Sequence, residues 1–165
     1  MEVINSENQK SVRYAGFWLR FVAYIIDDLI LGFIGFFIAL PFIGSIIFNA
    51  FQIADAERHD EKVFFGVAGI IGAVLLWIIA SIIVGWLYYA LMEASKNQGT
   101  LGKLALSLKV TDMDGNRISF GRATGRYFGK IISGMIFMIG YILAGLTEKK
   151  QALHDLIADC LVVRK

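Results

Sequence analysis

The sequence contains few of the residues from which covalent frameworks and metal sites are built. Among its 165 residues there are one cysteine, two histidines and one proline, and charged residues make up only 18%. The single cysteine, Cys160, excludes an intrachain disulfide, and no set of cysteines and histidines has the spacing of a zinc site. We therefore expect no metal site, and nothing in the sequence calls for a cofactor.

Apolar sequence takes the place of these residues, since 57% of the chain is hydrophobic. A helix that crosses a bilayer needs about 20 mostly apolar residues. Three runs without Lys, Arg, Asp, Glu or His reach or approach this length: Leu29–Ala54, Val63–Met92 and Ile131–Leu146. The second run ends in Trp86, Tyr88 and Tyr89, as expected of an aromatic belt at a membrane surface.

These runs predict an all-α membrane protein with about three transmembrane helices, built as a single domain over residues 1–165. The membrane segments are expected at about 17–54, 63–92 and 131–147. The first would be ~57 Å long as one helix, about twice the hydrocarbon thickness, so Pro41 is expected to divide or kink it. The third would be only ~24 Å long. It crosses if basic residues at its inner end snorkel, and is otherwise broken or re-entrant.

The charges of the loops predict the orientation. The connection 55–62 carries four acids against two bases, whereas the connection 93–130 carries seven Lys or Arg against three acids. By the positive-inside rule, the basic loop 93–130 and the N-terminus are cytoplasmic. The C-terminal tail is also basic, which favours the cytoplasm, although three complete crossings would leave it outside. We expect a cytoplasmic C-terminus.

The basic loop 93–130 is expected to contain a small cytoplasmic β-hairpin. Apolar residues alternate with more polar ones from Lys103 to Thr111, which is the period of a half-buried strand. Turn-forming residues follow at 112–116, and Arg117–Phe120 can return as a second strand. The tail segment 160–163 is a further β-prone piece that could extend the hairpin.

Three ionisable residues stand at the start of the first membrane segment, namely Arg20, Asp27 and Asp28. Such groups at membrane depth cost about 2.5–3.5 kcal/mol each on the insertion scale and usually have a function. Arg20 and Asp28 share a helix face but lie ~12 Å apart along the axis, so they need other partners. The candidate charge partners are Glu93, facing Arg20, with Arg122, Arg126 and Lys130.

The depth of the two aspartates stays open. If a helix runs from about Phe17 to Leu40, Asp27 and Asp28 lie near its middle. If the membrane is entered at Leu29, they lie at the cytoplasmic interface.

These blocks resemble the RDD family of small integral membrane proteins, named for one arginine and two aspartates. The resemblance rests on Arg20 with Asp27 and Asp28, then Gly99–Lys103, Leu108–Val110, Asp114-Gly115, Arg122 and Arg126, and Gln151–Ala158. It implies a bacterial inner-membrane protein, for which transport, including cation/proton exchange, is the suggested activity. The chain departs from the family pattern at Ala158-Asp159-Cys160, where a small residue and threonine are usual.

Two functions follow as alternatives. In the first, Asp27 and Asp28 bind protons and monovalent cations in a transporter, which must be a homo-oligomer because three spans hardly enclose a pathway. In the second, Arg20 and the aspartates form a static polar cluster in a scaffold or regulatory protein. Its basic loop and tail then bind lipid or a protein partner.

The remaining motifs favour structural roles. Four bases at 117–130 are interleaved with aromatic residues, which beside a bilayer indicates contact with anionic lipid headgroups rather than nucleic acid: Arg117, Arg122, Arg126 and Lys130. His154 and Asp155 lack the further histidines or the placed nucleophile of a hydrolase, so we expect a structural tail motif and no enzyme.

Overall fold

The computed structural model describes residues 13–56, 61–135 and 139–165, which fall into two compact units. The helical unit is Ile26–Tyr88, and the terminal unit combines Met1–Ile25 with Tyr89–Lys165. Each is described by itself.

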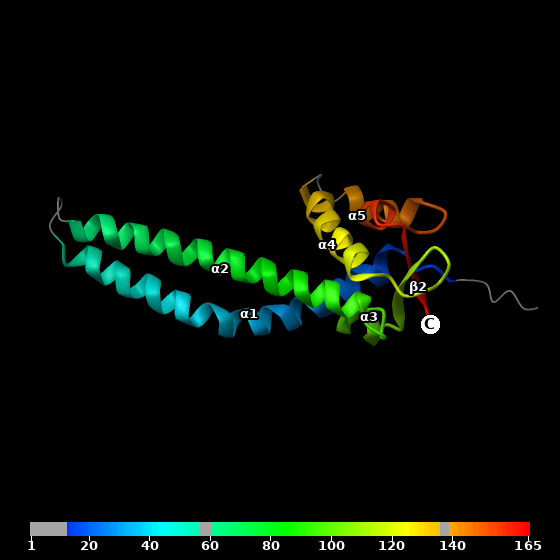
Figure 1. Ribbon diagram of the computed structural model, residues 1–165, viewed down its shortest axis with the longest axis horizontal. Helices are drawn as coiled ribbons and strands as arrows, with labels where there is room; N and C mark the ends of the chain where they lie inside the picture. Colours follow the sequence, from blue (N-terminus) through cyan, green and yellow to red (C-terminus); the bar gives the residue numbers. More distant parts are fainter. Residues whose placement is uncertain (1–12, 57–60, 136–138) are drawn as a thin grey trace, which may run out of the picture. The chain divides into compact units, whose positions relative to one another are not determined.

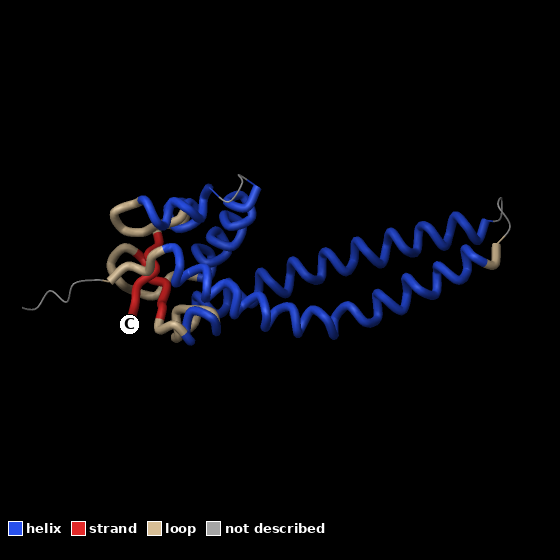
Figure 2. The backbone as a smooth tube through the Cα atoms, turned by 180° about the vertical axis from the view of Figure 1, so that it is seen from behind, coloured by secondary structure: helices blue, strands red, loops and turns tan. Residues whose placement is uncertain are grey.

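Two long antiparallel helices make up the helical unit. They belong to α1 (Phe17–Ala54) and α2 (Glu61–Ala94), which run side by side in both views (Figure 1 and Figure 2). Glycines let the helices approach closely, as is usual between membrane helices. A Cβ atom on Gly66 would lie 2.5 Å from Cγ1 of Ile53, and one on Gly69 would collide with the side chain of Asn49.

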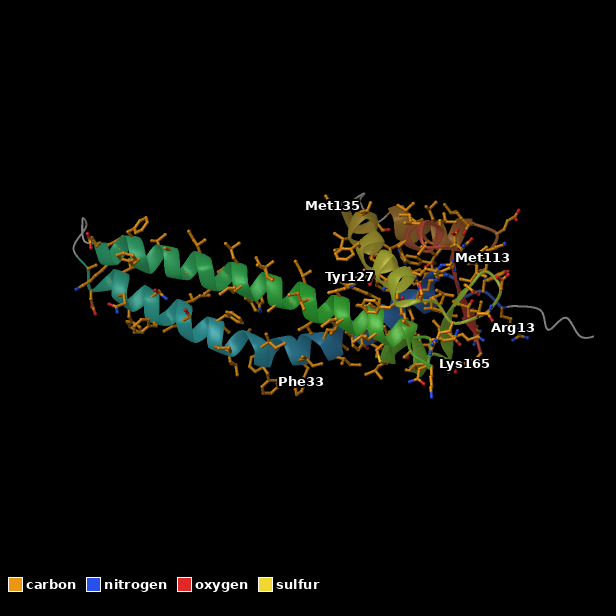
Figure 3. All side chains as sticks on the ribbon, in the orientation of Figure 1. Arg13, Phe33, Met113, Tyr127, Met135 and Lys165 are labelled. Atoms are coloured by element: carbon orange, nitrogen blue, oxygen red, sulfur yellow. The ribbon has the colours of Figure 1, made fainter. Side chains whose placement is uncertain are left out.

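The surface of this unit is apolar, as it must be in a bilayer. Phe33, Phe51 and Phe64 are each about 70% exposed, and Phe33 points away from α2 (Figure 3). Both α1 and α2 are long and apolar enough to cross a membrane. Pro41 lies inside α1 and does not divide it, because the helix continues through the proline along a curved path (Figure 2).

The third predicted membrane segment is a broken pair of helices in the terminal unit, as the short apolar run indicated. It consists of α4 (Phe120–Met135) and α5 (Ile139–Leu146), and the pair is bent by 98°. Counted together, they are a third candidate span or a re-entrant segment. One face of α4 is buried, at Ala123, Arg126, Gly129 and Ser133, and the helix packs on α5 and on α6 (Leu153–Ile157).

The predicted antiparallel strands are present, but the strand partner differs from the predicted hairpin. Strand β1 (Leu108–Asp112) pairs with β2 (Cys160–Arg164), with Leu108 opposite Arg164 and Asp112 opposite Cys160. The β2 strand contributes four consecutive buried residues, Cys160 to Val163, because it is covered on both faces. The tail therefore supplies the second strand, and the prediction that residues 117–120 would do so was wrong.

The chain forms helices on either side of β1 instead of further strands. Residues Leu101–Ala105 form α3, which begins where the amide of Leu104 donates to the carbonyl of Thr100. Leu104 lies within this helix and Leu106 caps its end, so the alternation of apolar residues at 104 and 106 did not mark a strand. Phe120 begins α4, which ends any return strand before it forms.

The N-terminal segment joins the same sheet beside β2. The amide of Ala15 donates to the carbonyl of Val162 at 2.8 Å, and the amide of Arg164 donates to the carbonyl of Arg13 at 2.9 Å. Tyr14 forms a bridge with Val163. Hydrogen-bonded segments cannot lie on opposite sides of a bilayer, so residues 13–15, β1 and β2 share one side.

Candidate functional site

The two aspartates of the first membrane segment have different surroundings. Asp27 is 1% exposed and its Oδ1 accepts a hydrogen bond from the hydroxyl of Tyr88 at 2.7 Å. Asp28 is exposed. Because adjacent helical residues point about 100° apart, only one of the two can face α2. The structure thus divides the pair between an inner and an outer position.

The level of Asp27 along the helices bears on the question of depth. The Asp27–Tyr88 hydrogen bond lies at one end of the apolar part of the helix pair, next to the run Leu29–Ala54. That run alone makes ~39 Å of helix, which exceeds the hydrocarbon thickness of ~30 Å. A bilayer can therefore be spanned entirely beyond Asp27.

Arg20 contacts the tail of the chain. Its Nη1 pairs with Oδ2 of Asp155, its Nη2 donates to the carbonyl of Lys150 at 2.6 Å, and its Nε donates to the carbonyl of Ala15 at 2.8 Å. A guanidinium presents donors in a fixed planar fork, which suits three acceptors at once. Arg20 thereby joins the start of α1 to α6 and to Lys150, which precedes α6.

A second carboxylate, that of Glu93 near the end of α2, forms ion pairs with three basic side chains. Its Oε1 accepts from Nζ of Lys103 at 2.5 Å and from Nζ of Lys130 at 3.4 Å, and its Oε2 accepts from Nη1 of Arg126 at 3.1 Å. Glu93 was predicted to face Arg20, but its partners come from α3 and α4. Arg126 connects the partners of Glu93 with those of Arg20, because its Nη2 donates to Oδ1 of Asp155 at 2.5 Å.

We call this set the ionic network. It comprises Arg20, Glu93, Lys103, Arg126, Lys130 and Asp155, all in the terminal unit. The side chains of Glu93, Arg126 and Asp155 are no more than 1% exposed. Removing one member of a buried pair leaves an uncompensated charge, which typically costs about 3–5 kcal/mol. The network therefore holds residues from five helices, namely α1, α2, α3, α4 and α6, in one arrangement within the terminal unit.

Burial and neighbouring charges shift the pKa values of several groups in and beside the network. Burial by itself would raise the pKa of Asp155, but the guanidinium groups of Arg126 and Arg20 outweigh it and hold that pKa well below its usual range. Burial lowers the pKa of Lys103, and the nearby Glu93 carboxylate offsets only part of this effect. Burial also lowers the pKa of His154 to about 3. Asp155 is therefore ionised and His154 neutral near pH 7.

The tail motif, His154 and Asp155, has more contacts within the terminal unit than the sequence indicated. Asp155 accepts from two arginines and also from the amide of Ala152 at 3.1 Å, which closes the first turn of α6. His154 contacts the hydroxyl of Ser133 at 3.5 Å and the ring of Tyr141. Its predicted structural role fits this packing, but the role of Asp155 as the common partner of Arg20 and Arg126 was not foreseen.

The four bases predicted to meet lipid headgroups separate into two pairs. Arg117 and Arg122 are exposed. Arg126 and Lys130 point into the ionic network, and Nζ of Lys130 also lies 3.8 Å from the centre of the Tyr89 ring. Only the first pair keeps the predicted role at a headgroup, because the other two cations already have buried partners. Lys103 and Tyr88 were missed altogether, since a lysine in a loop and a belt tyrosine carry no distinctive signal.

The chemistry available to the site is ionic rather than covalent. No group of three or more His, Cys, Asp or Glu suited to a metal occurs in the part of the chain that the structure describes. Cys160 is fully buried, and burial raises the pKa of its thiol to about 11, so it is a poor nucleophile.

These features define a helical membrane protein with two apolar spans and a compact ion-paired unit built from both ends of the chain. The model of the RDD family matches residues 14–159. The chain belongs to the RDD family.

Two curated relatives come from Bacillus subtilis (strain 168). YxaI, described as an uncharacterized protein, is 43% identical over 92% of this chain and 97% of its own length. YteJ, described as an uncharacterized membrane protein, is 29% identical over 92% of this chain and 82% of its own length. No solved structure matches the chain.

Proposed function

We propose that this protein is a scaffold or regulatory protein of the bacterial plasma membrane. In this proposal α1 and α2 anchor the chain, and the terminal unit is a preformed platform on the cytoplasmic face. The observation that carries it is the joining of residues 13–15, β1 and β2 by backbone hydrogen bonds. A platform built from both ends of the chain is suited to present one fixed surface to a lipid or protein partner.

The topology follows from the same hydrogen bonds. Because α1 leaves the terminal unit and α2 returns to it, the two spans bring the chain back to the starting side. The bent pair of α4 and α5 then enters and leaves on that side, so both termini lie with the basic loop. The seven bases of residues 93–130 favour the cytoplasm for all three. This arrangement also removes the conflict posed by the basic tail.

The protonation of Asp155 supports a structural role. A transported proton needs a group that changes its protonation near physiological pH. Asp155 is held ionised by two guanidinium groups, and every acid of the network has at least two basic partners. Such a network stabilises one arrangement.

Cation/proton transport is the second candidate, favoured by one specific observation. Asp27 is a buried carboxylate on an apolar helix pair, with the Tyr88 hydroxyl as a hydrogen-bond donor. Two spans with a bent pair hardly enclose a pathway, so this function requires a homo-oligomer. Asp27 then binds the proton or monovalent cation.

Proton flux in proteoliposomes separates the two candidates. The full chain is reconstituted with an internal pH dye, and gradients of Na⁺, Li⁺ or K⁺ are imposed on wild type, Asp27→Asn and Asp28→Asn. The scaffold proposal expects no cation-dependent flux from folded wild-type protein. Flux that depends on a cation gradient and is lost in Asp27→Asn overturns it and establishes the transporter. Asp28→Asn is the matched control, because it changes the same chemistry at the exposed position.

A further inference from the structure

Two adjoining hollows lie at the start of α1 in the terminal unit. They measure about 510 and 410 Å³ and share Gly16, Phe17, Trp18 and Lys150 in their linings. Because they share these walls, they form one trough with two ends. We call it the α1 trough.

One end of the α1 trough is basic. It is lined by Arg13, Lys150 and Arg164, which come from three separate segments of the chain. Arg13 lies on the surface of this unit (Figure 3). None of these three side chains forms an ion pair with any residue in the ranges 13–56, 61–135 and 139–165. Three unpaired cations around one hollow favour an anion.

The other end is apolar. It is lined by Ile142, Ala144 and Leu146 of α5, together with Phe17 and Trp18. Trp18 is 74% exposed and Leu146 is 77% exposed. Large apolar side chains so open to their surroundings indicate contact with membrane or with a partner. No acidic residue is among those lining either end.

The ionic network sets the shape of the α1 trough. Arg20 donates to the carbonyls of Ala15 and Lys150, which are next to the lining or part of it. The backbone that carries Lys150 is thereby fixed relative to the N-terminal segment. The Lys150 side chain lies beside Gly16, since a Cβ there would be 3.7 Å from Cδ of the lysine, an ordinary contact distance. The bases are thus held in position before any ligand arrives.

We propose that the α1 trough binds an anionic phospholipid, with its phosphate among Arg13, Lys150 and Arg164 and an acyl chain along Trp18 and Leu146. The amphipathic lining carries this choice, because a free phosphate needs only the basic end and an apolar peptide only the other. The proposal deepens the scaffold function and rests on it for the cytoplasmic leaflet as the source of the lipid. The bound lipid holds the terminal unit against the membrane surface.

Quenching of Trp18 by brominated lipid tests this contact. Trp77→Phe and Trp86→Phe leave Trp18 as the sole tryptophan of the full chain, since the sequence has three. The protein is reconstituted in phosphatidylcholine nanodiscs containing equal fractions of dibrominated phosphatidylglycerol or dibrominated phosphatidylcholine. We expect the anionic lipid to quench Trp18 more strongly. Equal quenching by the two lipids overturns the proposal.

Two triple variants locate the site. Arg13→Gln with Lys150→Gln and Arg164→Gln is expected to lower the preference for phosphatidylglycerol about tenfold or more, because each base near a membrane surface contributes measurably. The control is Lys96→Gln with Lys109→Gln and Lys149→Gln, which removes the same charge from positions outside the lining. Equal loss in both triples means a diffuse basic surface and overturns the site. Protection of Cys160 from a maleimide reagent shows that each variant is folded.

A soluble headgroup separates the lipid from a free anion. Added sn-glycerol 3-phosphate at millimolar concentration should leave the quenching unchanged, because it lacks the apolar contacts. Displacement of the lipid by this compound overturns the lipid as the ligand. The outcomes stay distinct from those of the flux experiment. Cation-dependent proton flux overturns the scaffold proposal whether or not Trp18 is quenched. Equal quenching by the anionic and the zwitterionic lipid overturns the lipid site but leaves the scaffold proposal intact.

Discussion

Arg20 and Asp155 are separated by 135 residues in the chain, yet they form a buried ion pair. The same guanidinium donates to Ala15 and Lys150. Arg20, at the start of the first membrane segment, therefore stabilises the fold of the C-terminal tail. Arg20 thus pairs within the terminal unit, whereas Asp27 accepts its hydrogen bond from Tyr88 within the helical unit.

Arg20→Gln is expected to destabilise the terminal unit by about 2–4 kcal/mol, because it leaves part of the Asp155 charge without a partner. Arg20→Lys should recover little of this, since an ammonium group cannot reproduce the planar fork. The measurement is the rate at which a maleimide reagent labels Cys160, which is fully buried in β2. The rate should rise in both variants.

A double-mutant cycle isolates the pair. If Arg20 and Asp155 act together, Arg20→Gln combined with Asp155→Asn destabilises less than the sum of the two single changes. Strict additivity contradicts the direct pairing. Lys109→Gln serves as the control for loss of one positive charge, because Lys109 lies on β1 and forms no ion pair with any other residue that the structure describes.

Acid is expected to weaken the terminal unit through His154. The folded pKa is lowered to about 3 by burial, whereas an unfolded histidine titrates near 6.5. The unfolded chain therefore binds an extra proton between these values, and stability falls as the pH decreases through this window. The loss from pH 7 to pH 5 is about 2 kcal/mol.

His154→Gln should flatten this dependence, even if its stability at pH 7 is lower. Thermal unfolding of the detergent-solubilised protein at pH 7, 6 and 5 measures the slope. Asp155 contributes only at lower pH, because its folded pKa is depressed and its stabilisation is lost below the ordinary carboxyl range. An unchanged slope in His154→Gln contradicts burial of a neutral imidazole.

Close packing of α1 on α2 predicts opposite effects at two glycines. Gly66→Ala brings a methyl group within 2.5 Å of Ile53 and 3.2 Å of the Asn49 carbonyl, so we expect destabilisation of about 1–3 kcal/mol. Gly72→Ala meets nothing within 4 Å and should be neutral or stabilising, because alanine favours the helix. Unfolding of both variants in the same detergent provides the comparison. Equal effects argue against this helix contact.

The sequence predicted the two spans well because long charge-free runs determine them physically. It also predicted a short third segment, either crossing or broken, from a run of 16 residues containing three glycines. The sheet was harder to predict, because β1 pairs with a strand about 50 residues away and both candidate partners are β-prone. The alternation from residue 103 also continues through the short helix α3, where no strand forms.

The sequence identified most residues of the candidate site but not how they pair. Arg20, Glu93 and Arg126 were singled out as charge partners, and Asp155 as part of a structural tail motif. Their pairing depends on how the tail folds back on α4, and no periodicity within one segment contains that information. Lys103 was missed because its place beside Glu93 arises from α3, a five-residue helix where a strand was expected.

Labelling from one side of the membrane tests the central claim that both ends of the chain and the basic loop lie together. Single cysteines replace the exposed residues Asp55, Asp114 and Glu148 in a Cys160→Ala background, and a membrane-impermeant maleimide is applied to sealed vesicles of each orientation. We predict that positions 114 and 148 are labelled from the cytoplasmic side and position 55 from the opposite side. Labelling of positions 55 and 148 from the same side, opposite to 114, would contradict the account.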